Sequence, residues 1–369
     1  VKSFIRKASL HKLNFLHFHL TEDQGWRVEI DKYPLLTKIG SVRKKTNFNH
    51  TPHSGFYTKA ELKCLVDYAH SFSISVMPEF DIPGHSRSAM ACYPYLGCFD
   101  RQLPVADHWG VKHDVLCAGK DSTYRFVEDV IDELCEIFPD EYFHIGGDEV
   151  PKHRWHLCPH CQSKIKELGL KDEEELQCYF MNRINDYCKS KGKQAFMWSW
   201  DLKDDKLLNE DLGFTKCGDI STADRPFIDT STTAYYIDLP YGYISLKDTA
   251  NHKLYDGNCL GAEATLWTEY VPNMKKADKM TYPRLGALAE TVWHGDTDYN
   301  SFKSMLDYYY SYLDKNDIGY SEPQIANPNK LRGFFQNLWF ERRQLTWEGL
   351  TNIFDDKKVE RLAKKHTSI

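Results

Sequence analysis

The sequence contains no long hydrophobic run, no block of basic residues, and no low-complexity segment or short repeat. No apolar stretch approaches the roughly 18 residues that a membrane-spanning helix needs, so we expect no membrane span. The net charge is −6 and Lys and Arg are dispersed, which argues against nucleic acid as a partner. The first ten residues carry neither a signal-peptide pattern nor an initiator Met, as expected of a processed or partial chain.

Dense cysteine pairing is also absent. The 11 cysteines are an odd number and are scattered, unlike the disulfide framework of a small secreted protein. Cys158-Pro159-His160-Cys161 is a CxxC pair with His153 and His156 just upstream, but a zinc site usually has a second, distant pair. We interpret this segment as a loop with two free thiols or a local disulfide, and we predict no metal site.

The composition that is present indicates a globular protein with a packed core. Hydrophobic residues make up 41%, charged residues 27% and aromatic residues 14% of the chain. Short apolar runs alternate with helical patterns, which predicts parallel strands covered by helices. The predicted strands cover residues 13–19, 73–78, 142–145, 195–198, 213–216, 233–237 and 260–264. The clearest helical patterns cover residues 3–11, 59–71, 122–138, 173–190 and 285–293.

This alternation predicts an α/β fold of the TIM (β/α)₈ barrel type in which seven strands are visible. A closed barrel of this type has about eight strands. Because the chain opens on a helical pattern, we expect the missing first strand to precede Val1. We assign residues 1–326 to the barrel, incomplete at its N-terminus, and residues 327–369 to a C-terminal helical extension that packs on it.

Polar residues gather just past most of the predicted strands, which is where parallel barrels form their active sites. One such cluster is usually a helix cap or a solvated turn, whereas clusters at successive strand ends favour a functional site. The clusters are HFHLTEDQGWR at 17–27, PEFDIPGH at 78–85, HIGGDE at 144–149, Trp198 with Trp200, YID at 236–238, and WTE at 267–269.

Asp148 and Glu149 form the most informative pair. Adjacent side chains on a strand point to opposite sides, but Gly146 and Gly147 free the backbone so that both carboxylates can face one barrel mouth. Close carboxylates repel when both ionise, so one keeps its proton near neutral pH, as a general acid facing a glycosidic oxygen requires. The alternative is a helix N-terminus, whose dipole favours acidic residues.

Taken together, these motifs resemble the signature of glycoside hydrolase family 20, in order from about residue 3 to residue 294. The resemblance rests on LNFLHFHL at 13–20, TEDQGWR at 21–27, PEFDIPGH at 78–85, HIGGDEV at 144–150, LWTEY at 266–270 and PRLGALAE at 283–290. It implies a retaining exo-β-N-acetylhexosaminidase whose partner is a glycan or glycoconjugate with a terminal N-acetylhexosamine. It also implies substrate-assisted catalysis through an oxazolinium ion, no cofactor, and a periplasmic, secreted or lysosomal location.

The resemblance implies a role for each residue of the predicted site. Glu149 is the general acid and then the base, and Asp148 orients the acetamide N–H and stabilises its positive charge. His85 and Glu22 tune Glu149 through a hydrogen-bonded chain. The implied substrate contacts are Tyr236 at the acetamide carbonyl, Asp238 at a sugar hydroxyl, Trp267 on the sugar ring, Glu269 at its far edge, Trp198 at the acetamide pocket, and Trp200 as a further wall of that pocket.

The residue types alone leave alternatives open for many of these positions. The three tryptophans are equally consistent with core packing, and His85 with a structural histidine after a Pro-Gly turn. His17, His19 and His144 lie within strands, so we expect each to be buried with a hydrogen-bond partner. Loop bracing is the alternative role for Glu79 and Asp81.

The sequence departs from the family pattern in ways that motivate competing hypotheses. No residue matches the arginine of the family's first strand, position 22 is Glu where many members have Asp, and Thr215-Lys216-Cys217 stands where a second pocket tryptophan is expected. The first alternative is therefore a catalytically impaired sugar-binding protein of the same fold. The second is a barrel hydrolase with a protein nucleophile. The oligomeric state is left open.

Overall fold

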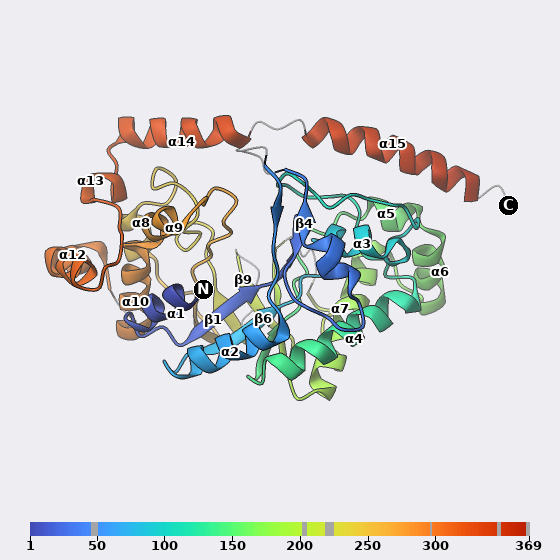
Figure 1. The fold of residues 1–369 in the computed structure, drawn as a ribbon, viewed down its shortest axis with the longest axis horizontal. Helices are drawn as coiled ribbons and strands as arrows, with labels where there is room; N and C mark the ends of the chain where they lie inside the picture. The colour runs from blue at the N-terminus through green and yellow to red at the C-terminus, as the bar shows by residue number, and fades with distance from the viewer. Residues whose placement is uncertain (46–50, 201–204, 218–224, 296, 345–347, 367–369) are drawn as a thin grey trace. The chain divides into compact units, whose positions relative to one another are not determined.

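The computed structural model describes residues 1–45, 51–200, 205–217, 225–295, 297–344 and 348–366 (Figure 1). The chain forms two compact units. The first comprises Val1–Lys2, Asn14–Gly213 and Trp347–Ile369, and the second comprises Ser3–Leu13 and Phe214–Thr346.

Parallel strands in the order β1-β6-β7-β8 form the centre of the first unit. They are β1 (Phe15–His19), β6 (Ser75–Glu79), β7 (Tyr142–His144) and β8 (Gln194–Trp198). The helices of this unit are α2 (Lys59–His70), α3 (Arg87–Cys92), α4 (Asp121–Ile137), α5 (His153–Leu157), α6 (Pro159–Leu168), α7 (Glu173–Ser190) and α15 (Glu348–His366). Short elements complete it: β2 (Thr21–Glu22) with β3 (Gly25–Trp26), β4 (Val42–Arg43) with β5 (His53–Ser54), a π-helix at Leu36–Gly40 and a 3₁₀-helix at Pro94–Leu96.

Local sequence accounts for the helix boundaries in this unit. Thr58 begins α2 with a capping box: its side chain accepts the Glu61 N–H, and the Glu61 carboxylate accepts the Thr58 N–H. Such a cap contributes about 1 kcal/mol. Asp172 begins α7 in a similar way, since its carboxylate accepts the N–H groups of Glu174 and Glu175. The buried face of α4 repeats at helical spacing through Tyr124, Val127, Val130, Ile131 and Leu134.

The second unit also contains parallel strands, in the order β9-β10-β11. They are β9 (Gly213–Lys216), β10 (Phe227–Asp229) and β11 (Cys259–Ala262). The helices are α1 (Lys2–Ser9), α8 (Leu246–Asn251), α9 (Met274–Thr281), α10 (Arg284–His294), α11 (Tyr299–Ser304), α12 (Leu306–Lys315), α13 (Pro323–Ala326) and α14 (Lys330–Gln344). Their core includes Leu246, Tyr282, Leu285 and Leu313.

The prediction of a strand at residues 233–237 is wrong. Residues 232–235 form a turn, Tyr236 makes only an isolated parallel bridge to Thr265, and the strand is β10, a few residues earlier. Asp229 accepts the Ser231 N–H, and the Ser231 carbonyl accepts the N–H groups of Ala234 and Tyr235. Polar side chains that bond nearby backbone favour turns over strands, which explains the difference. Every other predicted strand overlaps an observed one.

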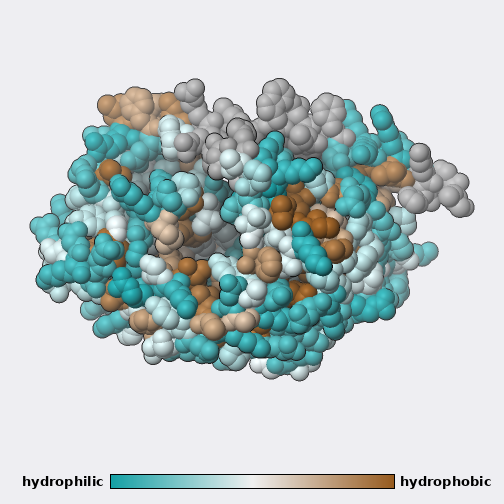
Figure 2. All heavy atoms as spheres, in the orientation of Figure 1, coloured by the Kyte–Doolittle hydropathy of each residue, from teal (hydrophilic) through white to brown (hydrophobic). Residues whose placement is uncertain are grey.

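The predicted fold class is confirmed, since the described residues contain seven parallel strands, four in the first unit and three in the second. The predicted division at residues 326 and 327 stays a prediction. No helix among the described residues is long and apolar enough to cross a membrane. Figure 2 shows apolar side chains exposed along α14, which include Leu331, Phe334, Phe335, Leu338 and Trp339.

Candidate active site

In the first unit, His85 lies among the carboxylates that the sequence analysis selected. Its Nδ1 lies 2.8 Å from Oε1 of Glu22. Its Nε2 lies 3.5 Å from Oε2 of Glu149 and 3.8 Å from Oδ2 of Asp148. Asp81 lies slightly farther away, with Oδ2 at 4.0 Å. The segments after β1, β6 and β7 therefore meet at this histidine, and the hydrogen-bonded chain predicted between Glu22, His85 and Glu149 stays a prediction.

Glu79, at the end of β6, connects this cluster to the interior of the first unit. Its Oε2 lies 2.6 Å from Nδ1 of His19 and 3.2 Å from Nε2 of His17, and its Oε1 lies 3.1 Å from Nδ1 of His144. Trp198 Nε1 donates to Oε1 at 2.7 Å. The expectation of a buried histidine with a hydrogen-bond partner is confirmed for His144, whose Nδ1 accepts the Gly146 N–H. His19 has its partner in Glu79, but His17 and His19 are only half-buried.

The charges in this cluster alternate in sign. Burial opposes the protonation of His85, but Glu22, Asp81 and Asp148 raise its pKa well above 6.5. Burial raises the pKa of Asp148 to about 6, and His85 opposes that rise. Burial, followed by the charge of Asp148, also raises the pKa of Asp81 well above its usual range. A cationic imidazole therefore faces carboxyl groups that hold a proton more readily than free ones.

The backbone at these positions is strained. His85 and Glu149 both have φ of 47°, and Thr268, between Trp267 and Glu269, has φ of 71°. Residues other than glycine rarely adopt this left-handed conformation, and such backbone strain concentrates at functional sites. Gly146 has φ of 64°, and a Cβ there would lie 1.7 Å from Oδ1 of Asp81, so only glycine fits before the Asp148-Glu149 pair.

The second unit contains four of the predicted substrate-binding residues, which are Tyr236, Asp238, Trp267 and Glu269. The rings of Tyr236 and Trp267 lie 6.2 Å apart at 56°, and Tyr236 Oη lies 3.4 Å from Sγ of Cys217. Burial and the charge of Glu269 raise the pKa of Asp238 to about 7. Within the part of the chain that the structure describes, Oδ1 of Asp238 is buried without a hydrogen-bond partner, which makes it an available acceptor.

Arg284 positions Asp238, although sequence reasoning gave it no role. It is fully buried, and its guanidinium donates to the carbonyls of Ile237 at 2.5 Å and Leu239 at 3.0 Å, the residues on either side of Asp238. It also donates to the carbonyl of Ile244 at 2.9 Å. The signal in the sequence was its place in the PRLGALAE motif at 283–290.

The two tryptophans that follow β8 differ in their surroundings. Trp198 is 2% exposed and stacks on His17 with ring centroids 5.7 Å apart, so its ring is part of the buried cluster around Glu79. Trp200 is 42% exposed. The predicted roles of both at an acetamide pocket stay predictions.

The CxxC segment is not the isolated loop that the sequence suggested. Cys158 caps the N-terminus of α6, and Cys161 lies in its first turn. Both are free thiols, so the local disulfide is absent, and two distant cysteines, Cys98 and Cys117, join them. Sequence reasoning missed these two partners.

In parallel α/β barrels the catalytic residues follow the ends of several strands, as His85 and its carboxylate neighbours do here. The chain belongs to glycosyl hydrolase family 20, because the model of that family's catalytic domain matches residues 1–296. The resemblance found in the sequence is thereby confirmed.

Individual relatives agree with this assignment. A beta-hexosaminidase of Porphyromonas gingivalis is 39% identical over 357 residues, which cover 89% of this chain but 45% of that relative, so the chain spans less than half of its length. A beta-hexosaminidase of Akkermansia muciniphila is 30% identical over 335 residues, covering 83% and 68%. The crystal structure of beta-N-acetylhexosaminidase from Bacteroides fragilis has a TM-score of 0.75 at 33% identity, covering 87% and 68%.

Proposed function

We propose that this chain is a retaining exo-β-N-acetylhexosaminidase that removes terminal N-acetylglucosamine or N-acetylgalactosamine from glycans or glycoconjugates. The names of the relatives support the reaction. The observation that carries the proposal is the approach of His85 Nε2 to both Glu149 and Asp148, at 3.5 and 3.8 Å. The nucleophile in this proposal is the acetamide oxygen of the substrate itself, which forms an oxazolinium ion.

Glu149 acts as the general acid and then as the base for the incoming water. It needs a proton when the glycosidic oxygen leaves and must take one back from water in the second step. His85 stands beside it as a cation whose other nitrogen is held by Glu22. A fixed positive charge stabilises the carboxylate of Glu149 once it has released its proton.

Asp148 stabilises the positive charge that develops on the acetamide. Among the described residues, its Oδ1 is buried without a hydrogen-bond partner. An unpaired buried acceptor costs about 1–3 kcal/mol, which a donor from the substrate recovers. The acetamide N–H is such a donor, and a carboxylate there strengthens its attraction as the oxazolinium ion forms.

In this proposal the residues of the second unit make the substrate contacts that the family resemblance implies. Tyr236 donates its hydroxyl to the acetamide carbonyl oxygen, and Trp267 stacks on the sugar ring. Asp238 offers its unpaired Oδ1 to a sugar hydroxyl, and Glu269 takes another hydroxyl. The pairing of an aromatic face with carboxylate acceptors suits a ligand with an apolar C–H face and a polar rim.

Turnover of two aryl glycosides tests this function. We expect the N-acetyl-β-glucosaminide to be cleaved and the β-glucoside, which lacks the acetamide, to be cleaved at least about 1,000-fold more slowly, because a built-in nucleophile contributes several kcal/mol. A thiazoline mimic of the oxazolinium ion should inhibit competitively. Cleavage of both substrates at similar rates would mean a protein nucleophile, and thiazoline binding without turnover of either would mean a sugar-binding protein.

A further inference from the structure

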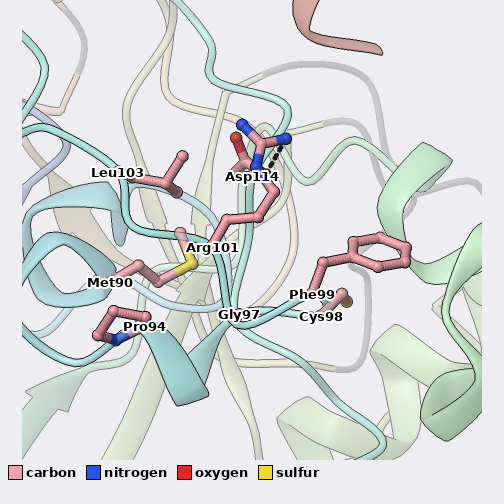
Figure 3. A pocket seen from close by; sticks show the side chains of 8 residues that line it. All are labelled: Met90, Pro94, Gly97, Cys98, Phe99, Arg101, Leu103 and Asp114. Atoms are coloured by element: carbon pink, nitrogen blue, oxygen red, sulfur yellow. Dashed lines mark ion pairs between the residues drawn. The ribbon is translucent and has the colours of Figure 1, made fainter. Parts of the chain in front are cut away.

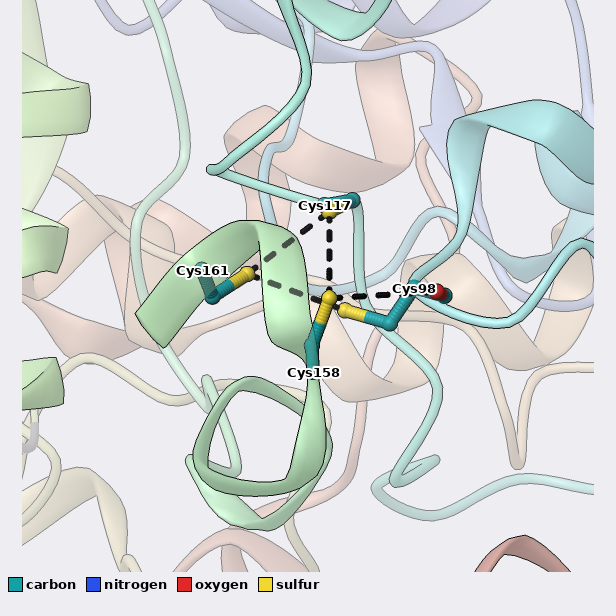
Figure 4. Close-up of side chains that lie close together, drawn as sticks. All are labelled: Cys98, Cys117, Cys158 and Cys161. Carbon is teal, nitrogen blue, oxygen red and sulfur yellow. Dashed lines mark hydrogen bonds between the residues drawn. The ribbon is translucent and has the colours of Figure 1, made fainter. Parts of the chain in front are cut away.

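Four cysteines from distant parts of the sequence meet in the interior of the first unit (Figure 4). Cys98 is 8% exposed, and Cys117, Cys158 and Cys161 are fully buried. The sulfur of Cys117 lies 3.7 Å from that of Cys158 and 3.6 Å from that of Cys161, and the sulfurs of Cys98 and Cys161 lie 3.9 Å apart. All four sulfur atoms lie within 4.8 Å of one another.

These separations match the edges of a metal–thiolate tetrahedron. Zinc binds four thiolates at about 2.3 Å in tetrahedral geometry, which places neighbouring sulfur atoms about 3.8 Å apart. The three sulfur–sulfur distances of 3.6, 3.7 and 3.9 Å bracket that value. We propose that Cys98, Cys117, Cys158 and Cys161 bind one structural zinc ion.

The thiol chemistry and the nearby backbone favour a divalent metal with a preference for sulfur. Four soft sulfur ligands in a closed tetrahedron favour zinc over Mg²⁺ and Ca²⁺, which are hard cations that bind oxygen ligands. Cys158 stands at the N-terminus of α6, and its sulfur receives a hydrogen bond from the Cys161 N–H. A helix N-terminus and an amide donor both stabilise a thiolate, which is the form that binds metal.

The backbone is built to bring the two pairs of cysteines together. A Cβ on Gly119 would lie 2.2 Å from the carbonyl carbon of His160 and 2.4 Å from the nitrogen of Cys161, so only glycine allows this approach. Trp155 Nε1 donates to the Leu116 carbonyl at 2.9 Å. The chain next to Cys117 is therefore fixed against the segment that carries the CxxC pair.

The site joins the two loops that carry the catalytic residues of the proposed function. The Leu116 N–H, next to Cys117, donates to the carbonyl of Pro83 at 2.9 Å, two residues before His85. On the other side, the CxxC pair follows Glu149 through α5. A zinc ion here fixes the loops after β6 and β7 to each other. This consequence rests on the proposed function, whereas the metal content does not.

Cys98 gives access to the site from one side. It lines a small pocket together with Arg101 and Asp114, whose ion pair measures 3.8 Å (Figure 3). The other three sulfurs are enclosed. We therefore expect slow exchange of the metal through Cys98, and release by a strong chelator rather than by dialysis.

Zinc analysis of the full chain tests the proposal. By elemental mass spectrometry, protein purified without a chelator should contain about one zinc per chain, and Cys117→Ser and Cys158→Ser should contain about tenfold less. Cys188→Ser is the matched control, because Cys188 is equally buried in α7 but lies outside the cluster, and it should keep its zinc. Equal loss in the control would overturn the assignment.

A second measurement needs no variant that might fail to fold. After removal of the metal, Co²⁺ added to the wild-type chain should give the strong thiolate-to-metal absorption of a tetrahedral four-sulfur site, and Zn²⁺ should abolish it. Zn²⁺ should also raise the melting temperature, whereas Mg²⁺ should not. Wild-type protein that contains no zinc and has these four cysteines joined in two disulfides by mass spectrometry would contradict the proposal. Intact zinc binding without glycosidase activity would refute only the proposed function.

Discussion

Oε1 of Glu22 lies 2.8 Å from Nδ1 of His85, although 63 residues separate them in the chain. The side chain of Glu22 is longer than that of Asp and spans this distance to the histidine. The contact continues inward, because Nε2 of His19 lies 3.4 Å from Oε2 of Glu22 and Nδ1 of His19 lies 2.6 Å from Glu79. Carboxylates and imidazoles thus alternate from the core to Glu149, and the charge on His85 depends on its neighbours.

Replacing Glu22 by Gln should move the alkaline limb of the pH–rate profile to lower pH. Glu22 is the largest of the influences that raise the pKa of His85, so without it His85 loses its proton at a lower pH. We expect kcat near pH 7.5 to fall by about 100-fold. Glu136→Gln, on the exposed side of α4, is the control. An alkaline limb unchanged in Glu22→Gln would show that Glu22 does not hold the charge of His85.

Asp148→Asn should make the fold more stable at pH 7.5 than the wild type. The pKa of Asp148 is raised from 3.8 to about 6, so the folded state binds this proton more tightly than the unfolded state does. The ionised carboxylate of Asp148 therefore lowers the stability of the fold at pH values above the folded pKa. This cost disappears as the pH falls from about 6 to 3.8. The gain in melting temperature should shrink at pH 5. Asp67→Asn, at an exposed position, is the control and should change the melting temperature equally at pH 7.5 and pH 5. A gain in the melting temperature of Asp148→Asn that is the same at both pH values would refute the raised pKa of Asp148.

Glu149→Gln should reduce turnover of an aryl N-acetylglucosaminide by roughly 10²–10⁴-fold, because the acid and base steps both lose their proton carrier. With an activated leaving group the first step needs no acid, so azide should restore turnover and give the β-glycosyl azide. Unchanged binding of the thiazoline inhibitor serves as the control for folding. If azide neither accelerates the variant nor appears in the product, Glu149 is not the acid/base.

Arg284→Met should destabilise the second unit and weaken sugar binding. The variant leaves the buried carbonyls of Ile237 and Ile244 and the half-buried carbonyl of Leu239 without their donor, and the expected loss is roughly 3 kcal/mol in urea unfolding. The loop that carries Asp238 also loses its support, so KM should rise more than kcat falls. Exposed Arg332→Met should have little effect. An unchanged KM in a folded variant would leave Arg284 a purely structural role.

Much of the fold was predictable because local signals agree with it. The helices begin where capping residues such as Thr58 and Asp172 stand, and the parallel strands coincide with short apolar runs. The exception at residues 233–237 has an apolar pattern, but the Ser231 hydroxyl just before it bonds the hydroxyl and the N–H of Thr233 and favours a turn. Periodicity alone does not reveal this competition.

The candidate site was predictable in its motifs but not in its supporting contacts. Glu22, His85, Asp148 and Glu149 each stand in a recognisable segment. The four-cysteine cluster was missed because Cys117 and Cys158 lie 41 residues apart and Cys98 and Cys161 lie 63 apart. Spacing along the chain does not predict contacts between cysteines this far apart, because these contacts depend on how the loops after β6 and β7 fold against each other.

Fluorine substitution on the acetamide of the substrate tests the central claim most directly. Aryl N-acetyl, N-fluoroacetyl, N-difluoroacetyl and N-trifluoroacetyl glucosaminides differ mainly in the electron density of the carbonyl oxygen. If that oxygen attacks C1 while Asp148 stabilises the resulting cation, kcat/KM should fall steeply and steadily along the series. A series with no dependence on fluorine would contradict substrate-assisted catalysis at this site.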